Sequence, residues 1–237
     1  VQESILPPNI NGIDGVDIGA VYSPAREVGG DFYNIFNLDR SQFIVVIGDV
    51  SNKGVPAALV MSAASGMISS LLADDPHLSV SELAGRLNNL LVRDIIRDRE
   101  MFVTLFFGKF NLDERFLTYC NAGHLPGIYW DAARSEKLEL AKGGAIVGQF
   151  ADLSFAEGRQ PLGSGDRLVL FTDGLTEAVD SHNNLFGRKR VESLVAGGAS
   201  LQSQEFCQMV KDHIDEYARG APEESHDDFT LVQVKVR

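Results

Sequence analysis

Cysteine, tryptophan and methionine are scarce in this chain of 237 residues, which has two, one and four of them. The two cysteines, Cys120 and Cys207, lie far apart, and the five histidines show no spacing typical of metal ligands. A disulfide framework and a His/Cys metal site are therefore not expected. This cysteine usage fits a reducing compartment or simply a fold without disulfides, and we expect a cytoplasmic location.

Positive charge is also in deficit. The chain has 21 Lys and Arg residues against 33 Asp and Glu residues, a net charge of -12. Such a balance argues against a nucleic-acid backbone as the main partner. A divalent cation or a basic patch on a partner protein fits better, although an acidic surface can also serve solubility alone.

Long hydrophobic runs are nearly absent. The longest uncharged stretch, residues 55–73, contains a proline and many small residues. It therefore favours a buried helix over a membrane span, and we expect no membrane contact. The first residues are short of basic charge and broken by prolines, so they do not resemble a signal peptide. Because the chain opens on Val1 instead of methionine, we expect an upstream segment.

What the sequence does have is aspartate at strand ends. Asp49 closes the apolar run 43–50, and Asp173 follows the apolar run 167–171. Asp31 precedes Phe32-Tyr33, and the pair Asp227-Asp228 precedes a final apolar run. Each site alone is equally explained by a turn or a helix cap. Their recurrence favours one acidic cluster, and clustered carboxylates repel one another unless a hard divalent cation lies among them.

Periodicity predicts strands in runs, interrupted by helices. The predicted strands cover residues 16–24, 31–38, 43–50, 101–111, 116–121, 127–130, 137–140, 166–171 and 229–236. The predicted helices cover residues 54–73, 173–178, 188–195 and 204–217, with a further helix that begins at a capping box, Ser79 to Glu82. This order favours an α+β fold, a single domain of two stacked antiparallel β-sheets flanked by helices.

Five short motifs occur in an order that resembles a known family. They are Val28-Gly29-Gly30-Asp31-Phe32-Tyr33, Gly48-Asp49-Val50-Ser51-Asn52-Lys53-Gly54, Asn121-Ala122-Gly123-His124, Phe171-Thr172-Asp173-Gly174 and Asp227-Asp228-Phe229-Thr230. This set is similar to that of SpoIIE-type serine phosphatases, a bacterial branch of the metal-dependent protein phosphatase 2C family. The resemblance covers the whole chain. It implies that residues 1–8 end an upstream linker helix and that residues 9–237 form one phosphatase domain.

The resemblance also implies a two-metal site with two Mn²⁺ or Mg²⁺ ions at one end of a double-sheet sandwich. Asp49 would bridge the two ions, beside the carbonyl of Val50. Asp173 and Asp227 would complete the shell of one ion, and Asp31 would hold the other. Asp49 and Asp173 would then act in catalysis through metal-activated water.

Other motif positions are less certain in role. Arg26 stands where eukaryotic relatives carry a phosphate-binding arginine, although a solvated surface arginine fits equally well. Ser51 stands where those relatives carry a histidine thought to act as general acid, so the protonation of the leaving group is left to metal-bound water. Asn34 and Asn52 depart from the residues common at their positions, Asp and a small residue respectively, but neither is an implied metal ligand.

Two histidines lie close to the motifs. We expect a structural role for His124, at a turn after a strand, and a supporting or solvent-exposed role for His226, beside Asp227.

The resemblance implies a protein serine/threonine phosphatase that acts on an anti-sigma-factor antagonist in partner-switching signalling. It also implies an upstream sensor or receiver domain and is compatible with a homodimer. The alternatives are a catalytically silent adaptor of the same fold and an unrelated hydrolase of small phosphoesters. The intact aspartates at positions 31, 49, 173 and 227 argue against the adaptor.

Overall fold

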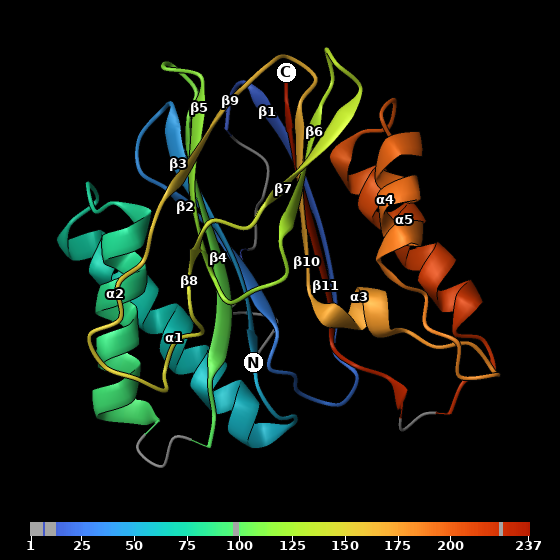
Figure 1. The fold of residues 1–237 in the computed structure, drawn as a ribbon, viewed down its shortest axis with the longest axis horizontal. Helices are drawn as coiled ribbons and strands as arrows, with labels where there is room; N and C mark the ends of the chain where they lie inside the picture. Colours follow the sequence, from blue (N-terminus) through green and yellow to red (C-terminus); the bar gives the residue numbers. More distant parts are fainter. Residues whose placement is uncertain (1–6, 8–12, 97–99, 223–224) are drawn as a thin grey trace.

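Two β-sheets stack at the centre of the computed structural model, and helices cover both outer sides (Figure 1). The structure describes residues 7, 13–96, 100–222 and 225–237. The predicted linker helix at residues 1–8 falls almost entirely outside the described residues. The described part confirms the predicted α+β architecture of two stacked sheets with helices outside.

One sheet contains five strands, all antiparallel to their neighbours. Their order is β1 (Val16–Ser23), β11 (Phe229–Val236), β10 (Arg167–Phe171), β6 (Gly127–Asp131) and β7 (Glu136–Leu140). The first and last strands of the chain thus pair along their full length, with Val16 opposite Val236.

The other sheet has six strands. Its order is β2 (Phe32–Asn37), β3 (Gln42–Val50), β4 (Val103–Asn111), β5 (Phe116–Ala122) and β8 (Gly143–Gly144), with β9 (Gly158–Pro161) also paired to β5. The short pairing of β5 with β8 is parallel, and the others are antiparallel. In β3 the residues from Phe43 to Ile47 are all fully buried. Such a continuous buried run is expected of a strand that is covered on both faces.

Each sheet has its own helices (Figure 1). Helices α1 (Val55–Asp74) and α2 (Val80–Leu90), followed by a π-helical turn (Leu91–Ile95), pack on the six-stranded sheet. Helices α4 (Arg188–Gly197) and α5 (Ser203–Tyr217) pack on the five-stranded sheet. The short α3 (Asp173–Glu177) follows β10 directly.

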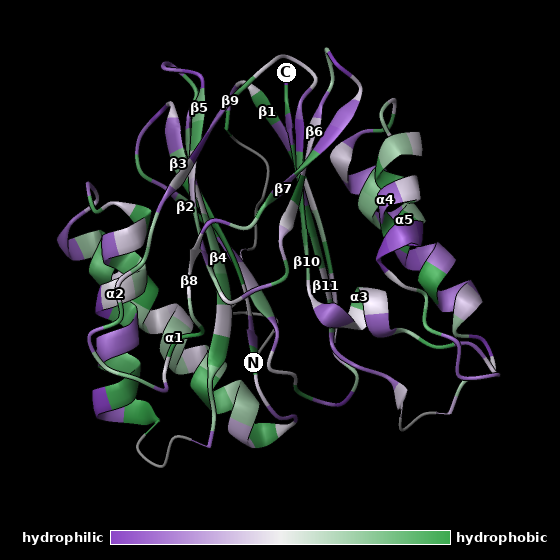
Figure 2. Cartoon of the chain, viewed as in Figure 1, coloured by the Kyte–Doolittle hydropathy of each residue, from purple (hydrophilic) through white to green (hydrophobic). Residues whose placement is uncertain are grey.

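Local sequence explains how the helices on the six-stranded sheet begin. Helix α2 begins with the predicted capping box, in which Ser79 and Glu82 each accept the backbone N–H of the other. Helix α1 has a proline in its first turn, a position where the missing N–H has no intrahelical partner to lose. It is apolar over most of its length (Figure 2), and by length and composition it could span a membrane. In this fold its buried side chains, Met61 and Ile68 among them, belong to the core.

The chain reversals bring four acidic segments to one edge of the sandwich. Strand β2 begins opposite the end of β3, with Phe32 paired to Gly48. Strand β10 ends opposite the beginning of β11, with Phe171 paired to Leu231. Asp31, just before β2, and Thr172, just after β10, therefore face one another across the sandwich. The hydrogen bond between them, described below, establishes this contact.

Candidate active site

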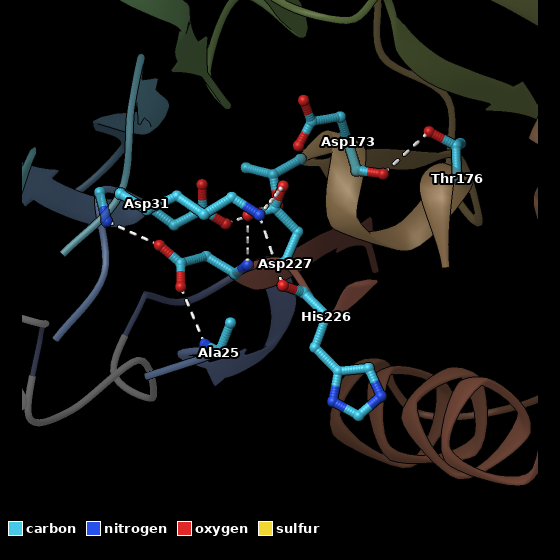
Figure 3. Close-up of polar contacts among 10 residues, drawn as sticks. Ala25, Asp31, Asp173, Thr176, His226 and Asp227 are labelled. Carbon is cyan, nitrogen blue, oxygen red and sulfur yellow. Dashed lines mark hydrogen bonds and ion pairs between the residues drawn. The ribbon is translucent and has the colours of Figure 1, made fainter. Parts of the chain in front are cut away.

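The aspartates predicted from strand ends come from four segments that meet at this edge. Figure 3 shows Asp31, Asp173 and Asp227 projecting from separate segments of the chain. Asp31 immediately precedes β2, Asp49 is the penultimate residue of β3, Asp173 opens α3 and Asp227 lies two residues before β11. Their mutual effects on pKa show that these carboxyl groups are electrostatic neighbours.

Asp31 ties the two sheets together. Its Oδ2 accepts hydrogen bonds from Thr172 Oγ1 at 2.6 Å and from Thr230 Oγ1 at 2.8 Å, both on the five-stranded sheet side. The Thr172 hydroxyl oxygen also accepts the backbone N–H of Thr230 at 3.0 Å. Burial and the nearby Asp49 raise the pKa of Asp31 well above its usual value, despite the two hydroxyl donors. A buried carboxyl in this state is poised to gain from a cation.

Asp49 and Asp173 are also destabilised as anions. Burial, followed by Asp173 and Asp227, raises the pKa of Asp49 to about 7, and a hydrogen bond with Asp31 opposes this shift. Burial and Asp227 raise the pKa of Asp173, while Lys53 lowers it. The shared direction of these shifts means that burial, and then repulsion between neighbouring carboxylates, disfavours the charged form of each group.

Lys53 provides the one ion pair of a cluster carboxylate in the described part of the chain. Its Nζ lies 2.8 Å from Asp227 Oδ2, and it also donates to the backbone oxygen of His226 at 3.4 Å. The Lys53 side chain is 41% exposed, so this pair lies at the rim of the cluster.

Asp228 has a different task from its neighbour. Its carboxylate accepts the backbone N–H of Ala25 at 2.9 Å and that of Gly30 at 2.7 Å, so it fixes the loop that leads from β1 to Asp31. A Cβ at Gly29 would collide with this carboxylate, and one at Gly174 would collide with the Asp228 backbone oxygen. Glycine is therefore required at both positions for the segments to approach one another.

The donor set suits hard divalent cations. Every side chain that the cluster offers is a carboxylate, and the raised pKa values show that added positive charge would be stabilising. The Val50 carbonyl oxygen lies close to Gly30 at the same edge, because a Cβ there would come within 2.8 Å of it. Among the described residues, no three His, Cys, Asp or Glu side chains already stand as a formed ligand set. Asp31 and Asp227 are instead turned to the threonine hydroxyls and to Lys53.

Ser51 and Asn52 lie in the loop after Asp49, and both have structural roles there. The Ser51 hydroxyl oxygen accepts the backbone N–H of Phe102 at 2.8 Å, and the Ser51 N–H donates to the Phe102 oxygen at 2.9 Å. Ser51 thus anchors the loop. Asn52 has φ 72°, a left-handed conformation that Asn tolerates better than most residues, which explains why this departure from a small residue is accommodated. Asn34 lies in β2 and accepts the backbone N–H of Ile35.

His124 has the structural role that the sequence predicted. One ring nitrogen lies 2.8 Å from Thr104 Oγ1 and the other 3.1 Å from the Phe171 oxygen. The Asn121 side chain bonds both the N–H and the oxygen of His124. Burial lowers the pKa of His124 to about 4, so the ring is neutral at physiological pH.

Two other predicted residues lie on the surface. The His226 ring is exposed and points away from the labelled carboxylates in Figure 3, as expected for a residue outside the ligand set. Arg26 is exposed on the loop between β1 and β2, next to the anchored Ala25. Its phosphate-binding role stays a prediction. A cavity of about 220 Å³ borders the cluster at Asp227 and Gly174.

Sequence reasoning assigned no role to Lys53, Thr172 and Thr230, and it counted Asp228 only as part of the acidic pair Asp227-Asp228, although all four stand inside the motifs quoted above. The available signal was their adjacency to the aspartates. What it lacked was the partner, because the hydrogen bonds to Asp31 join residues 141 and 199 positions apart.

We compared the sequence and the structure of this chain with those of known proteins. Residues 39–237 match the family "Stage II sporulation protein E (SpoIIE)". Phosphoserine phosphatase RsbU of Bacillus subtilis is 32% identical over 235 residues, which cover 99% of this chain and 68% of RsbU. The SiaA-PP2C domain of Pseudomonas aeruginosa has a similar structure, with a TM-score of 0.86 at 20% identity, covering 100% of this chain and 93% of that one. The catalytic domain of the phosphatase PstP, solved with two manganese ions, has a TM-score of 0.64 at 15% identity, covering 93% of this chain and 98% of that domain.

The two stacked sheets thus have the PP2C fold. The match over most of its length and the identity to RsbU show that the chain belongs to the SpoIIE family. The predicted family and fold are confirmed, and a protein serine/threonine phosphatase is favoured over a silent adaptor.

Proposed function

We propose that this domain is a metal-dependent phosphoserine/phosphothreonine protein phosphatase whose site is the carboxylate cluster at the sheet edge. The observation that carries the proposal is the raised pKa of three clustered aspartates in a chain of the SpoIIE family. Four acidic segments are folded together at an energetic cost that a bound cation would remove. A fold that only displayed a surface would have no need of that cost.

The residues divide the work by position. Asp49, Asp173 and Asp227 are partly exposed at the edge and would hold the ions on the substrate side, with the Val50 carbonyl beside Asp49. Asp31 is buried and oriented by two threonine hydroxyls, and it would hold the second ion. When bound, two Mn²⁺ or Mg²⁺ ions would activate water and neutralise the phosphoryl oxygens.

We assign no protein side chain as the nucleophile. The Ser51 hydroxyl oxygen accepts the Phe102 N–H, the Thr172 and Thr230 hydroxyls donate to Asp31, and the carboxylates would be occupied as metal ligands. The site therefore fits direct hydrolysis, in which the serine oxygen of the substrate leaves. Arg26, on the loop that Asp228 fixes at Ala25 and Gly30, would be the phosphate-binding residue.

The relatives support a proposal for the substrate and the setting. RsbU is named a phosphoserine phosphatase, and this chain matches 99% of its own length to it. We infer that the substrate is a small phosphorylated anti-sigma-factor antagonist in a cytoplasmic partner-switching pathway. Control would come from an upstream sensor or receiver domain, in a full-length protein that forms a homodimer.

The experiment is a titration of Mn²⁺ against hydrolysis of p-nitrophenyl phosphate, followed by a phosphoserine-protein assay. We expect saturable dependence on Mn²⁺ and a higher kcat/KM on the phosphoprotein. No hydrolysis at any Mn²⁺ concentration would favour the silent adaptor. Efficient hydrolysis of small esters with none of the phosphoprotein would favour the small-phosphoester hydrolase.

A further inference from the structure

Lys53 is a cation held at the carboxylate cluster by the shape of its loop. It lies between Asn52 and Gly54, both with φ in the left-handed region, 72° and 77°. The preceding Ser51 is fixed to Phe102 by two hydrogen bonds. The backbone conformation and these hydrogen bonds restrict the loop, and the loop therefore directs the Lys53 side chain towards the cluster.

The ammonium of Lys53 supplies positive charge to the carboxylate cluster. It lies 2.8 Å from Asp227 Oδ2, and its charge lowers the pKa of Asp173. The pair joins the loop after β3 to the loop before β11, and Lys53 also reaches the His226 oxygen at 3.4 Å. A divalent ion bound by Asp227 would compete with this ammonium for the same carboxylate oxygen.

The proposed function leaves a place for such a freed cation. A phosphoserine phosphate is a dianion that must approach a cluster of carboxylates, and an ammonium at the rim is a strong point-charge partner for it. The Ser51 hydroxyl oxygen accepts the Phe102 N–H, so we do not assign Ser51 as the phosphate-binding group. The Lys53 side chain is 41% exposed, so the ion pair with Asp227 can break without disturbing the packing of the core.

We propose that Lys53 is a phosphate-binding residue of this phosphatase, and that it is ion-paired with Asp227 until a metal ion displaces it. This inference rests on the proposed function. It assigns two opposite consequences to one side chain: Lys53 opposes metal binding, and it favours the binding of phosphate once the metal is in place. If Lys53 only held the two loops together, its loss would weaken both metal binding and phosphate binding.

The test compares Lys53→Met with wild type in two binding measurements. Calorimetry with Mn²⁺ and the metal-free protein should give a Kd about threefold to tenfold lower in the variant, because the metal no longer breaks an ion pair. Inhibition by inorganic phosphate at saturating Mn²⁺ should give a Ki about tenfold higher, because a charge-assisted contact is lost. The difference in Mn²⁺ affinity should shrink at 1 M salt, where the rim ion pair is screened.

Two further variants separate the explanations. Lys53→Arg keeps the charge and should stay near wild type in Mn²⁺ affinity. Lys189→Met removes an exposed lysine on α4 and should change neither constant, which controls for net charge. If Lys53→Met fails to fold without metal, Lys53→Gln is measured in its place.

Each outcome decides the matter. Tighter Mn²⁺ binding together with weaker phosphate binding supports the assignment. Weaker or unchanged Mn²⁺ binding overturns the displacement of Lys53 by the metal, and an unchanged Ki for phosphate overturns the phosphate contact. If wild type itself binds no Mn²⁺, the proposed function fails instead.

Discussion

At the scale of single residues, the site is governed by carboxylates that are held against their own repulsion. Asp49 shows this best, since burial and its acidic neighbours raise its pKa to about 7. Its contribution to metal-free stability is present below the unfolded pKa of about 4 and is lost as the pH rises through about 7. The metal-free protein therefore loses stability in the range where the cluster becomes ready for a cation.

Asp49→Asn should consequently stabilise the metal-free protein. At pH 8 we expect a gain of roughly 2 kcal/mol in the free energy of unfolding, because the buried negative charge is gone. The gain should shrink towards pH 5, where Asp49 of the wild type is protonated in the folded state. Urea denaturation at the two pH values, in the presence of a chelator, measures it. A variant that is less stable than wild type at pH 8 would show that Asp49 is not under electrostatic strain.

His124 should give the opposite dependence on pH. Its folded pKa of about 4 lies below the unfolded value, so its contribution is complete above about pH 6.5 and is lost as the pH falls towards 4. Between pH 7.5 and pH 5 the wild type should lose about 2 kcal/mol more stability than His124→Gln. Denaturation curves of both proteins at these pH values test this. Parallel losses in the two proteins would mean that the ring is not buried as a neutral group.

At the scale of elements, the sequence predicted what local pattern controls. The strands β1, β2, β3 and β11 were found within about two residues because each is an apolar run between turn residues. Helix α2 was marked by its capping box. Strands β8 and β9 were missed, since Gly143–Gly144 has no side chains and Gly158–Pro161 has no alternation. Both exist only because β5 offers a pairing edge, which is a tertiary effect.

The same division holds for the site. The aspartates of the cluster could be proposed because a carboxylate at the end of a buried strand is costly and therefore conspicuous. Thr172 and Thr230 are ordinary strand-end residues until the sheets stack and direct their hydroxyls to Asp31. Lys53 received no role from the sequence, because its partner Asp227 is remote in sequence.

Helix α1 links this edge to the rest of the six-stranded sheet. Ala57, in its first turn, lies against Gly30, where an added Cβ would come within 3.1 Å of the Ala57 Cβ. Because Gly30 precedes Asp31, a shift of the beginning of α1 would move the Asp31 carboxylate, which we propose as a metal ligand. We interpret α1 as a regulatory element that an upstream domain can shift, against the alternative of a permanently packed core helix.

Ala57→Val tests this interpretation. The extra methyl groups should overpack the contact with Gly30, cost about 1–3 kcal/mol of stability and also lower Mn²⁺ affinity and turnover per folded molecule. Leu72→Ala, at the far end of the buried face of α1, is the control. It should cost about 2–5 kcal/mol and leave Mn²⁺ affinity and turnover of the folded fraction unchanged. If Ala57→Val also alters stability alone, α1 is a packed helix and not a switch.

At the scale of the whole molecule, metal binding should appear as stability. A ligand that binds only the folded state adds roughly 2.7 kcal/mol at a hundredfold excess over its Kd. We expect Mn²⁺ to raise the midpoint of thermal unfolding in a concentration-dependent way, and Asp49→Asn to weaken this response. An unchanged midpoint at millimolar Mn²⁺ would support the silent adaptor.

The most direct test of the account is the rate of phosphate release from a phosphoserine protein as a function of Mn²⁺ concentration, in wild type and Asp49→Asn. Circular dichroism of both proteins establishes that equal amounts are folded. The account predicts saturable, Mn²⁺-dependent release by wild type and none above background by the variant. Release at the wild-type rate by Asp49→Asn would contradict it, because the carboxylate cluster would then not be the catalytic centre.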